Sequence, residues 1–466
     1  MGSMLKLTTN TILFLGVVWI VASRILVPGA NIQPDSPRYV TAGLNLYQHG
    51  ILSGERYRED EPPEPGLYAG GVLTAVEIAT AAMLSKDTYR DLMCVAEVSV
   101  DEGCGRGLWS LKAIYFLEAC IFHLCALFVG WRFFGRNMIA AWGVVAASML
   151  FKDTYAYASS PLSEQGYLML AGLFASAWIY SFDNAEKMFS WFISGLVAGL
   201  LVLVKPAWLL LPIGLALISF FALLAGKSPK RQTLTASASF CVAFVLALAP
   251  MLLRNWIVLD TFAMSEQSYL VSSLSHRLAF NLMSWKEWLI GWIYYVPVSG
   301  AQRLFGLDVL LPLGWGETSY YQFGRDTLDD LANDGRSVLE ARNYLLSEYV
   351  FAMPLKFVAV TLLLFWRGIF VGHVVAMLAV PSAGLITVFA RNGIWLRWMF
   401  LILPFLFMAG VNAVLSVSLY RYNLALIIPY SIAMVWVMMT AINFMLSRFC
   451  QTGFLATAKT FLPAKR

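Results

Sequence analysis

Charged residues are scarce in this 466-residue chain, in which Asp, Glu, Lys and Arg together make up 13% of the sequence. Soluble globular domains use about 25%. Hydrophobic residues reach 59%, and the mean hydropathy is +0.67. This composition excludes a soluble globular protein and predicts an all-α polytopic membrane protein.

Motifs of several enzyme and binding classes are also missing. The sequence contains no glycine-rich phosphate loop, no Walker sequence and no zinc-finger spacing, and its four histidines form no constellation. It also shows no internal repeat of the kind found in many transporters. These absences argue against the nucleotide-binding and zinc-binding classes that such motifs identify.

Apolar runs predict the membrane-spanning helices, each of which needs about 20 apolar residues. The first run lacks a small-residue cleavage site, so we interpret it as a retained span and not as a signal peptide. Two stretches, 285–306 and 355–371, are ambiguous, and counting both raises the total from ten spans to twelve. The ten runs that meet or approach the required length are residues 10–28, 109–131, 137–152, 162–182, 190–204, 206–225, 233–253, 373–390, 398–418 and 423–446.

Positive charges set the orientation, because Lys and Arg in short loops favour the cytoplasmic side. With the N-terminus inside, that side receives the loops containing Arg132, Lys187, residues 226–232 and Arg391, and also the C-terminal tail. The formal net charge of +5 follows from this topology, so we expect no nucleic-acid partner.

The same topology places two long segments, 29–108 and 254–372, outside the membrane. It divides the chain into an N-terminal transmembrane module (1–255), an extracytoplasmic segment (256–372) and C-terminal transmembrane helices with a tail (373–466). Residues 68–84 form an apolar stretch with Glu77 in its middle. We expect an interfacial helix there, with polar groups turned to water. Tryptophans and tyrosines at 285–295 predict a second interfacial region.

Cys94 and Cys104 lie in the outer segment 29–108, with Gly103 and Gly105 available for a turn. An oxidising compartment permits a disulfide between them. A metal pair is the alternative, but no nearby histidine completes a zinc set. We therefore predict a disulfide.

The stretch Pro34-Asp35-Ser36-Pro37-Arg38-Tyr39 follows the first span and places an acid and a base where membrane meets water. One interpretation is local, with Asp35 and Ser36 capping a helix that begins at Pro37. The other is functional. Read as D-x-x-R-Y, the stretch resembles the first outer loop of the GT-C membrane glycosyltransferases. Within that superfamily it is most similar to the branch of the protein O-mannosyltransferases and the lipid A aminoarabinose transferase. The resemblance implies that Asp35 is the catalytic carboxylate.

Further motifs extend the resemblance along the chain. Lys-Pro, Arg-Asn and Arg-Tyr motifs stand at the outer ends of later spans. Each basic residue has a structural alternative, because Lys and Arg at span ends extend to lipid headgroups. The resemblance implies a site for the donor phosphate and substrate that is formed by Arg38, Tyr39, Tyr68, Lys205, Arg254, Asn255, Arg421 and Tyr422.

Two acidic residues are candidates for a second carboxylate. Glu64 lies in a Pro-rich loop before Tyr68, where the aminoarabinose transferase carries a Lys that this chain lacks. It is either a catalytic or metal-binding carboxylate or part of a solvated loop. Glu164 stands at the start of the fourth span, where an ionisable residue is either functional or a helix cap.

The resemblance also implies a reaction. A sugar would move from a polyprenyl-phosphate donor to a glycolipid, glycan or protein acceptor, with inversion at the anomeric carbon. The implied location is the bacterial inner membrane, with the active site on the periplasmic face. Asp35 would act as the base, and the cations would balance the charge of the leaving phosphate. No cofactor is required, although the acidic loop could hold a divalent metal. The alternative is a lipid or sugar transporter without transferase activity.

Overall fold

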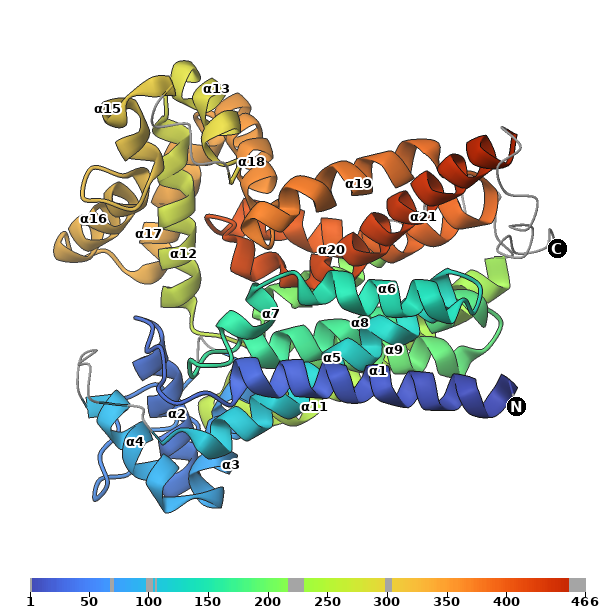
Figure 1. Ribbon diagram of the computed structural model, residues 1–466. Coiled ribbons are helices and arrows are strands. Elements are labelled where there is room, and N and C mark those ends of the chain that lie inside the picture. The colour runs from blue at the N-terminus through green and yellow to red at the C-terminus, as the bar shows by residue number, and fades with distance from the viewer. Residues whose placement is uncertain are drawn as a thin grey trace.

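The computed structural model consists of helices and the loops that join them (Figure 1). It describes residues 2–67, 71–97, 104, 107–216, 230–297 and 304–451. Within these ranges every regular element is a helix.

The longer helices fall into two groups along the chain, and short segments join several of them. The first group is α1 (Gly2–Ile25), α2 (Ser36–His49), α3 (Val72–Leu84), α4 (Lys86–Glu97), α5 (Trp109–Phe133), α6 (Met138–Met149), α7 (Asp153–Ala156), α8 (Glu164–Asp183), α9 (Met188–Val202) and α11 (Lys230–Leu259). The second group is α12 (Gln267–Ala279), α13 (Trp285–Tyr294), α15 (Leu307–Leu310), α16 (Tyr320–Asn333), α17 (Val338–Leu346), α18 (Pro354–Ile369), α19 (Ala376–Phe389), α20 (Asn392–Leu415) and α21 (Ile427–Gln451). The short 3-10 or π segments are η1 (Pro206–Leu210), η2 (Phe280–Leu282), η3 (Leu311–Leu313), η4 (Ser347–Phe351), η5 (His373–Val375) and η6 (Tyr420–Leu426).

Five helical stretches are long and apolar enough to cross a membrane, and they make the chain an integral membrane protein. Each coincides with a predicted span. They are Thr8–Ile25, Trp109–Phe133, Gln232–Leu259, Gly393–Leu415 and Tyr420–Arg448.

The other predicted spans also fall on helices, namely α6, α8, α9, Pro206–Ala216 and α19. Several of these are short. The 12 residues of α6 extend about 18 Å at 1.5 Å per residue, against roughly 30 Å for a bilayer core. The number of crossings, ten to twelve, stays a prediction.

The two ambiguous stretches behave differently. Of residues 285–306, α13 covers only ten, which is too few for a span. The helix α18 follows η4 through a bend of 93°, and the bent pair Val338–Phe351 and Pro354–Ile369 is long and apolar enough for one broken span or a re-entrant loop. Pro354 begins α18, and a proline cannot donate the hydrogen bond that would continue the preceding helix.

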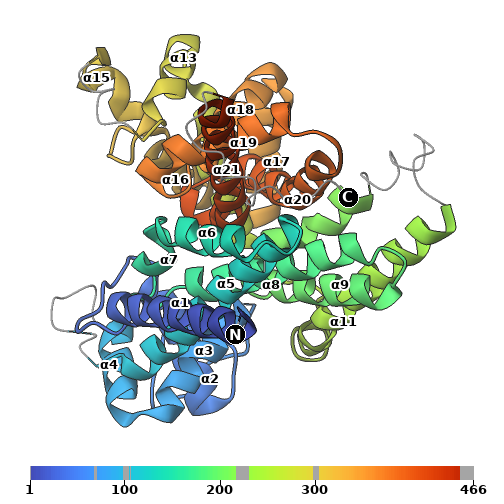
Figure 2. The same cartoon turned by 45° about the vertical axis from the view of Figure 1, so that its right-hand side comes forward.

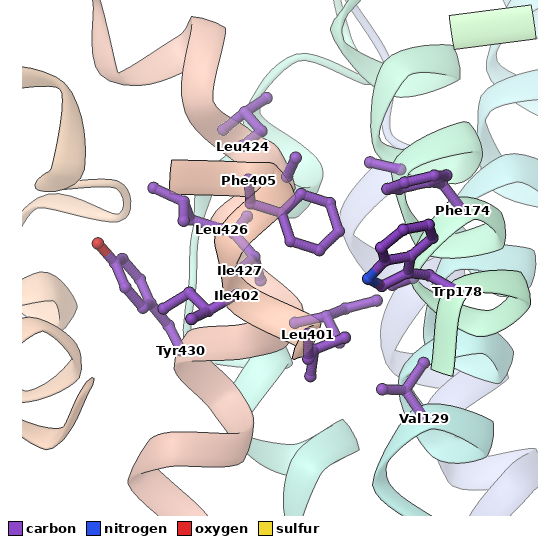
Figure 3. Close-up of a cluster of buried hydrophobic side chains, with 14 of the residues drawn as sticks. Val129, Phe174, Trp178, Leu401, Ile402, Phe405, Leu424, Leu426, Ile427 and Tyr430 are labelled. Carbon is purple, nitrogen blue, oxygen red and sulfur yellow. The ribbon is translucent and has the colours of Figure 1, made fainter. Parts of the chain in front are cut away.

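The main core lies where α8 meets α20. The indole of Trp178 stacks on Phe400 with ring centroids 4.5 Å apart, and its N–H donates to the Phe400 carbonyl at 2.7 Å. Figure 3 shows Phe174 and Trp178 facing Leu401 and Phe405 across this contact. Stacked aromatic rings contribute both buried area and a preferred geometry. The contact therefore joins the N-terminal helices to the C-terminal helices.

A buried lysine and a half-buried arginine mark the two ends of the helix bundle. Lys112, in the first turn of α5, donates to the carbonyls of Val27 and Gly29 just after α1. Arg397, near the start of α20, donates to the carbonyl of Arg132 at the end of α5. We call these the Lys112 end and the Arg397 end. Figures 1 and 2 show α1 alongside α5, with α2, α3 and α4 at the Lys112 end.

The second outer segment is fixed to the bundle by Arg277 of α12, which is fully buried. Its guanidinium donates to the Ala413 carbonyl at 2.7 Å, the Thr361 hydroxyl at 2.6 Å and the Asn281 side chain at 3.0 Å. A buried charge is tolerated when its donors are satisfied. A single side chain thus links α12 to α18 and α20.

The expected orientation of the helix in 68–84 is wrong. The polar groups of α3 do not turn to water, because Thr74 and Glu77 are buried where α3 contacts α2 and α5. Glu77 forms a hydrogen bond with Glu118 of α5. The helix α8 also approaches closely, and a Cβ on Gly166 would lie 2.6 Å from Glu77 Oε1. Two buried carboxyl groups in contact favour a shared proton over two charges.

We predict that Arg277→Ala destabilises the protein by about 3 kcal/mol, because buried acceptors lose their charged donor. The thermal unfolding midpoint of the detergent-solubilised protein measures this loss. Arg336→Ala, at an exposed position of the same outer segment, is the matched control. Equal midpoints for Arg277→Ala and the wild type would contradict the proposed anchoring role.

Candidate functional site

Asp35 lies directly before α2. The helix begins at Ser36 and has Pro37 in its first turn, where a missing N–H costs nothing. Asp35 occupies the cap position, but its side chain makes no capping hydrogen bond. The Ser36 hydroxyl instead accepts from the backbone N–H of Gln33 at 3.0 Å. The carboxylate of Asp35 is therefore not used to cap the helix.

Asp35 pairs with Arg421, which lies 386 positions away in the sequence. Arg421 Nη2 is 2.6 Å from Asp35 Oδ2, and the Asp35 side chain remains 51% exposed. Arg421 belongs to η6, whose position is fixed by Asn412. The Asn412 amide donates to the Tyr422 carbonyl at 3.2 Å and to the Asn423 side chain at 2.8 Å. The carboxylate thus has one cationic partner and an accessible side.

Lys205 forms a second ion pair next to the first. It precedes Pro206 at the break between α9 and η1, and its ammonium lies 3.2 Å from Glu164 Oε1. Glu164 is the buried first residue of α8, a position where the helix dipole favours an acid. The Lys205 ammonium also lies 5.6 Å from the Tyr422 ring centroid, and the Arg421 guanidinium lies 5.5 Å from the same ring. Tyr422 therefore connects the two ion pairs.

Tyr39 and Arg38 extend the group along α2. The Tyr39 hydroxyl lies 3.3 Å from the Ser163 hydroxyl. Burial and the negative charge of Glu164 raise the pKa of Tyr39, so this phenol keeps its proton and can donate a hydrogen bond. The Arg38 guanidinium lies 4.7 Å from the ring centroid of Tyr269 in α12. The two outer segments therefore meet at this point.

The assembled group carries three cations, Arg38, Lys205 and Arg421, against the carboxylates of Asp35 and Glu164, for a net charge of +1. An accessible carboxylate can accept a proton from a hydroxyl. Clustered cations can stabilise a phosphate, because charges already in place need no reorganisation. The group thus offers a base and an anion-binding surface side by side.

Arg254 and Asn255 have other partners. Arg254 donates to the carbonyls of Leu52 and Gly66, both at 2.9 Å. Asn255 donates to the Ala263 carbonyl at 2.7 Å. These bonds hold the loops that follow α2 and α11. Arg254 and Asn255 therefore position these loops, and their role toward the donor phosphate stays a prediction.

Glu64 is the remaining predicted catalytic or substrate-binding residue that the structure describes, and it stands apart from the ion pairs. Glu64 lies in an exposed loop, where its backbone N–H donates to the Glu55 side chain at 3.0 Å, and no described contact joins it to Asp35. Tyr68 lies outside the described residues. Cys94 and Cys104 form a disulfide, with Cα atoms 5.6 Å apart. Within the described ranges, no three His, Cys, Asp or Glu residues gather to hold a metal, and the divalent metal stays an untested prediction.

Comparison with protein-family models and with curated sequences gives no match. Among solved structures, a similar chain is ArnT from Cupriavidus metallidurans, determined as a crystal structure bound to undecaprenyl phosphate. The two chains are 13% identical, with a TM-score of 0.36, over 92% of this chain and 77% of that chain. A likeness at this level carries no argument about fold or function.

Aromatic residues of the second outer segment also belong to the site, and the motifs did not indicate them. Burial raises the pKa of Tyr321, and the negative charge of Asp35 raises it further. Tyr321 stacks on His276 with ring centroids 4.3 Å apart and lies edge to face with Trp315 at 4.9 Å. These rings and the ring of Tyr269 all belong to the second outer segment, which therefore forms one side of the site. No sequence pattern distinguishes them from the other aromatic residues of a chain that is 14% aromatic.

A buried carboxyl pair lies behind the ion pairs. Tyr115 of α5 donates to the Leu162 carbonyl at 3.1 Å. It also interacts electrostatically with Glu77, Glu118 and Glu164. The Glu77 and Glu118 pair therefore lies close to the start of α8, where Glu164 holds Lys205.

This pair predicts a pH dependence of stability. Burial, and then the charge of Glu118, raise the pKa of Glu77 well above its usual value. A carboxyl group with a raised pKa in the folded state contributes stability at low pH that is lost as the pH rises through the folded-state pKa. The wild type should therefore lose stability relative to Glu77→Gln as the pH rises from about 5 to about 9.

Thermal unfolding midpoints of the solubilised protein across this pH range provide the measurement. Glu348→Gln, at an exposed position, is the control and should follow the wild-type profile. If Glu77→Gln has the same pH profile as the wild type, the shared-proton interpretation is wrong.

Proposed function

We propose that this protein is a membrane glycosyltransferase that moves a sugar from a polyprenyl-phosphate donor to an acceptor hydroxyl. One observation carries the proposal. The Asp35 carboxylate is half-exposed, is not used as a helix cap, and is paired at 2.6 Å with Arg421 from the other end of the chain.

Asp35 is the general base in this proposal. The sugar of such a donor is already activated, because its anomeric carbon bears a phosphate that leaves without protonation. The acceptor hydroxyl needs a group that removes its proton as the new bond forms. The exposed side of the Asp35 carboxylate is available for that hydroxyl, while Arg421 holds the other oxygen. In-line attack inverts the anomeric configuration.

The donor phosphate is bound by Arg421 while this residue keeps its ion pair with Asp35. Arg421 uses Nη2 for Asp35, and its buried Nε has no hydrogen-bond partner. A guanidinium has five N–H donors in a planar fork and can bind two anions at once. Lys205 lies close to the same Tyr422 ring as Arg421 and supplies the second charge. Arg38 and the Tyr39 hydroxyl complete the anion-binding surface.

The acceptor is a glycolipid, glycan or protein that reaches the extracytoplasmic face of the bacterial inner membrane. The rings of Tyr269, Tyr321 and Trp315 supply apolar faces on which a sugar can stack. The ion pairs gather at one end of the bundle, near the loops. A carrier is expected to place its polar site near the middle of the membrane. This placement favours a transferase over a transporter.

We expect Asp35→Asn to lower sugar transfer by about 100- to 10,000-fold, the range associated with a general base. Asn has nearly the same size as Asp but cannot take the proton. Donor binding should persist, because Arg421 and Lys205 remain. Transfer by purified protein from a radiolabelled polyprenyl-phosphate sugar measures the first effect, and retention of that donor measures the second.

Asp87→Asn is the matched control, since Asp87 is an exposed acid of the same outer segment whose ion pair with Arg90 is 3.7 Å long. It should transfer at the wild-type rate. Near wild-type turnover by Asp35→Asn would end the assignment of this base.

A further inference from the structure

A polar pocket lies at the Arg397 end of the bundle, away from Asp35. It has a volume of about 420 Å³ and is lined by Arg132, Gly135, Arg136, Asp183, Asn184 and Arg397. These residues come from the end of α5, the turn before α6, the end of α8 and the start of α20. In Figure 1 this end of the bundle carries the N-terminus, opposite α2 and α4.

The charges in the pocket do not cancel. Asp183 lies between two arginines, with Oδ2 at 2.8 Å from Arg132 Nε and Oδ1 at 2.9 Å from Arg397 Nη2. Among the described residues, Arg136 forms no ion pair with a carboxylate. Three guanidinium groups therefore face one carboxylate, and the lining has a net charge of +2. The pocket is suited to an anion.

The turn between α5 and α6 fixes Arg136 at the edge of the pocket. The Arg136 N–H donates to the Trp131 carbonyl at 2.7 Å, and the Gly135 N–H donates to the Arg132 carbonyl at 3.4 Å. These two bonds form a helix C-cap, in which the residues after the helix adopt a left-handed backbone conformation. Both Gly135 and Arg136 accordingly have positive φ angles. The exposed Arg136 guanidinium lies 5.6 Å from the ring centroid of Trp131. The side chain is thus held by a backbone turn and by an aromatic ring, not by an acid.

The surroundings favour a lipid as the source of the anion. The pocket lies at the ends of α5 and α20, two helices long and apolar enough to cross a membrane. Tryptophan at such helix ends marks the headgroup level, and Trp131 adjoins the pocket. Basic pockets between membrane helices on the cytoplasmic side bind anionic headgroups. Arginine also binds phosphate through two parallel hydrogen bonds.

We propose that this pocket binds the phosphate of an anionic phospholipid headgroup at the face of the membrane opposite the Asp35 site. The positive charges of Arg132, Arg136 and Arg397 then have a binding role besides setting the orientation of the chain. The proposal is independent of the transfer reaction, because no residue of the pocket belongs to the site at the Lys112 end.

The test uses the full-length protein in a neutral detergent. The rise in its thermal unfolding midpoint is recorded against increasing dihexanoyl phosphatidylglycerol, dihexanoyl phosphatidylcholine or sodium phosphate at fixed ionic strength. A ligand that binds only the folded state raises the midpoint, and the stabilisation grows as RT ln(1 + [L]/Kd), so a weaker site needs a higher ligand concentration for the same rise. We expect phosphatidylglycerol to stabilise the wild type and phosphatidylcholine to have little effect.

Three variants locate the effect. Arg136→Gln removes an exposed charge without breaking an ion pair and should weaken the response to phosphatidylglycerol about tenfold. Arg136→Lys keeps the charge but loses the planar fork, so its response should fall between those of the wild type and Arg136→Gln. Arg391→Gln removes an exposed arginine at the same end that does not line the pocket, and its response should be unchanged.

The outcomes separate the alternatives. A response lost in Arg136→Gln and kept in Arg391→Gln supports the proposal. Stabilisation by sodium phosphate with the same dependence on Arg136, and none by the lipid, would keep the phosphate chemistry but overturn the lipid source. Equal responses of the wild type and both Arg136 variants, or equal losses in Arg136→Gln and Arg391→Gln, would overturn the pocket assignment.

Discussion

Two ion pairs at one end of the bundle organise the structure. Asp35 with Arg421 and Lys205 with Glu164 join the start of α2, the start of α8, the break before η1 and the turn η6. A charge next to an apolar bundle is costly unless a partner or water satisfies it. The two ion pairs therefore stabilise the contacts among these four segments. The same charges carry the proposed transfer reaction, so in that proposal the site assembles as the chain folds.

The parts of this arrangement differ in how far sequence alone determines them. Long apolar runs place the helices, because the bilayer imposes length and hydropathy on each crossing. Asp35, Lys205 and Arg421 each stand in a short motif beside a span, and the structure places the three near the Tyr422 ring. Their roles in the reaction stay predictions. The partners of Arg254 were not foreseeable, since they are carbonyls of loop 52–66, which has no periodic pattern. The expected exposure of Glu77 to water is wrong for a similar reason. Its environment depends on α5, which begins over 30 positions further along the chain.

The second outer segment adds what motifs do not reveal. Arg277 attaches this segment to the bundle and so positions α12. In this position, the ring of Tyr269 contacts the guanidinium of Arg38 from the first outer segment. Two regions without a shared motif thus contribute to one surface. Aromatic residues there are ordinary members of an aromatic-rich chain until the fold brings Tyr321 within the electric field of Asp35. Site residues supplied by contact between distant loops escape any analysis that proceeds along the sequence.

The close approach of α8 to α3 has an evolutionary consequence. Gly166 leaves the volume that the Glu77 carboxyl group occupies, and any larger residue at 166 would bring a carbon atom to 2.6 Å from Glu77 Oε1. To remove this overlap, the Glu77 carboxyl group must leave its position beside Glu118 or the side chain at 77 must become shorter. Positions 77 and 166 should therefore co-vary among relatives. A glycine at 166 should accompany a long side chain at 77, and a larger residue at 166 a shorter one.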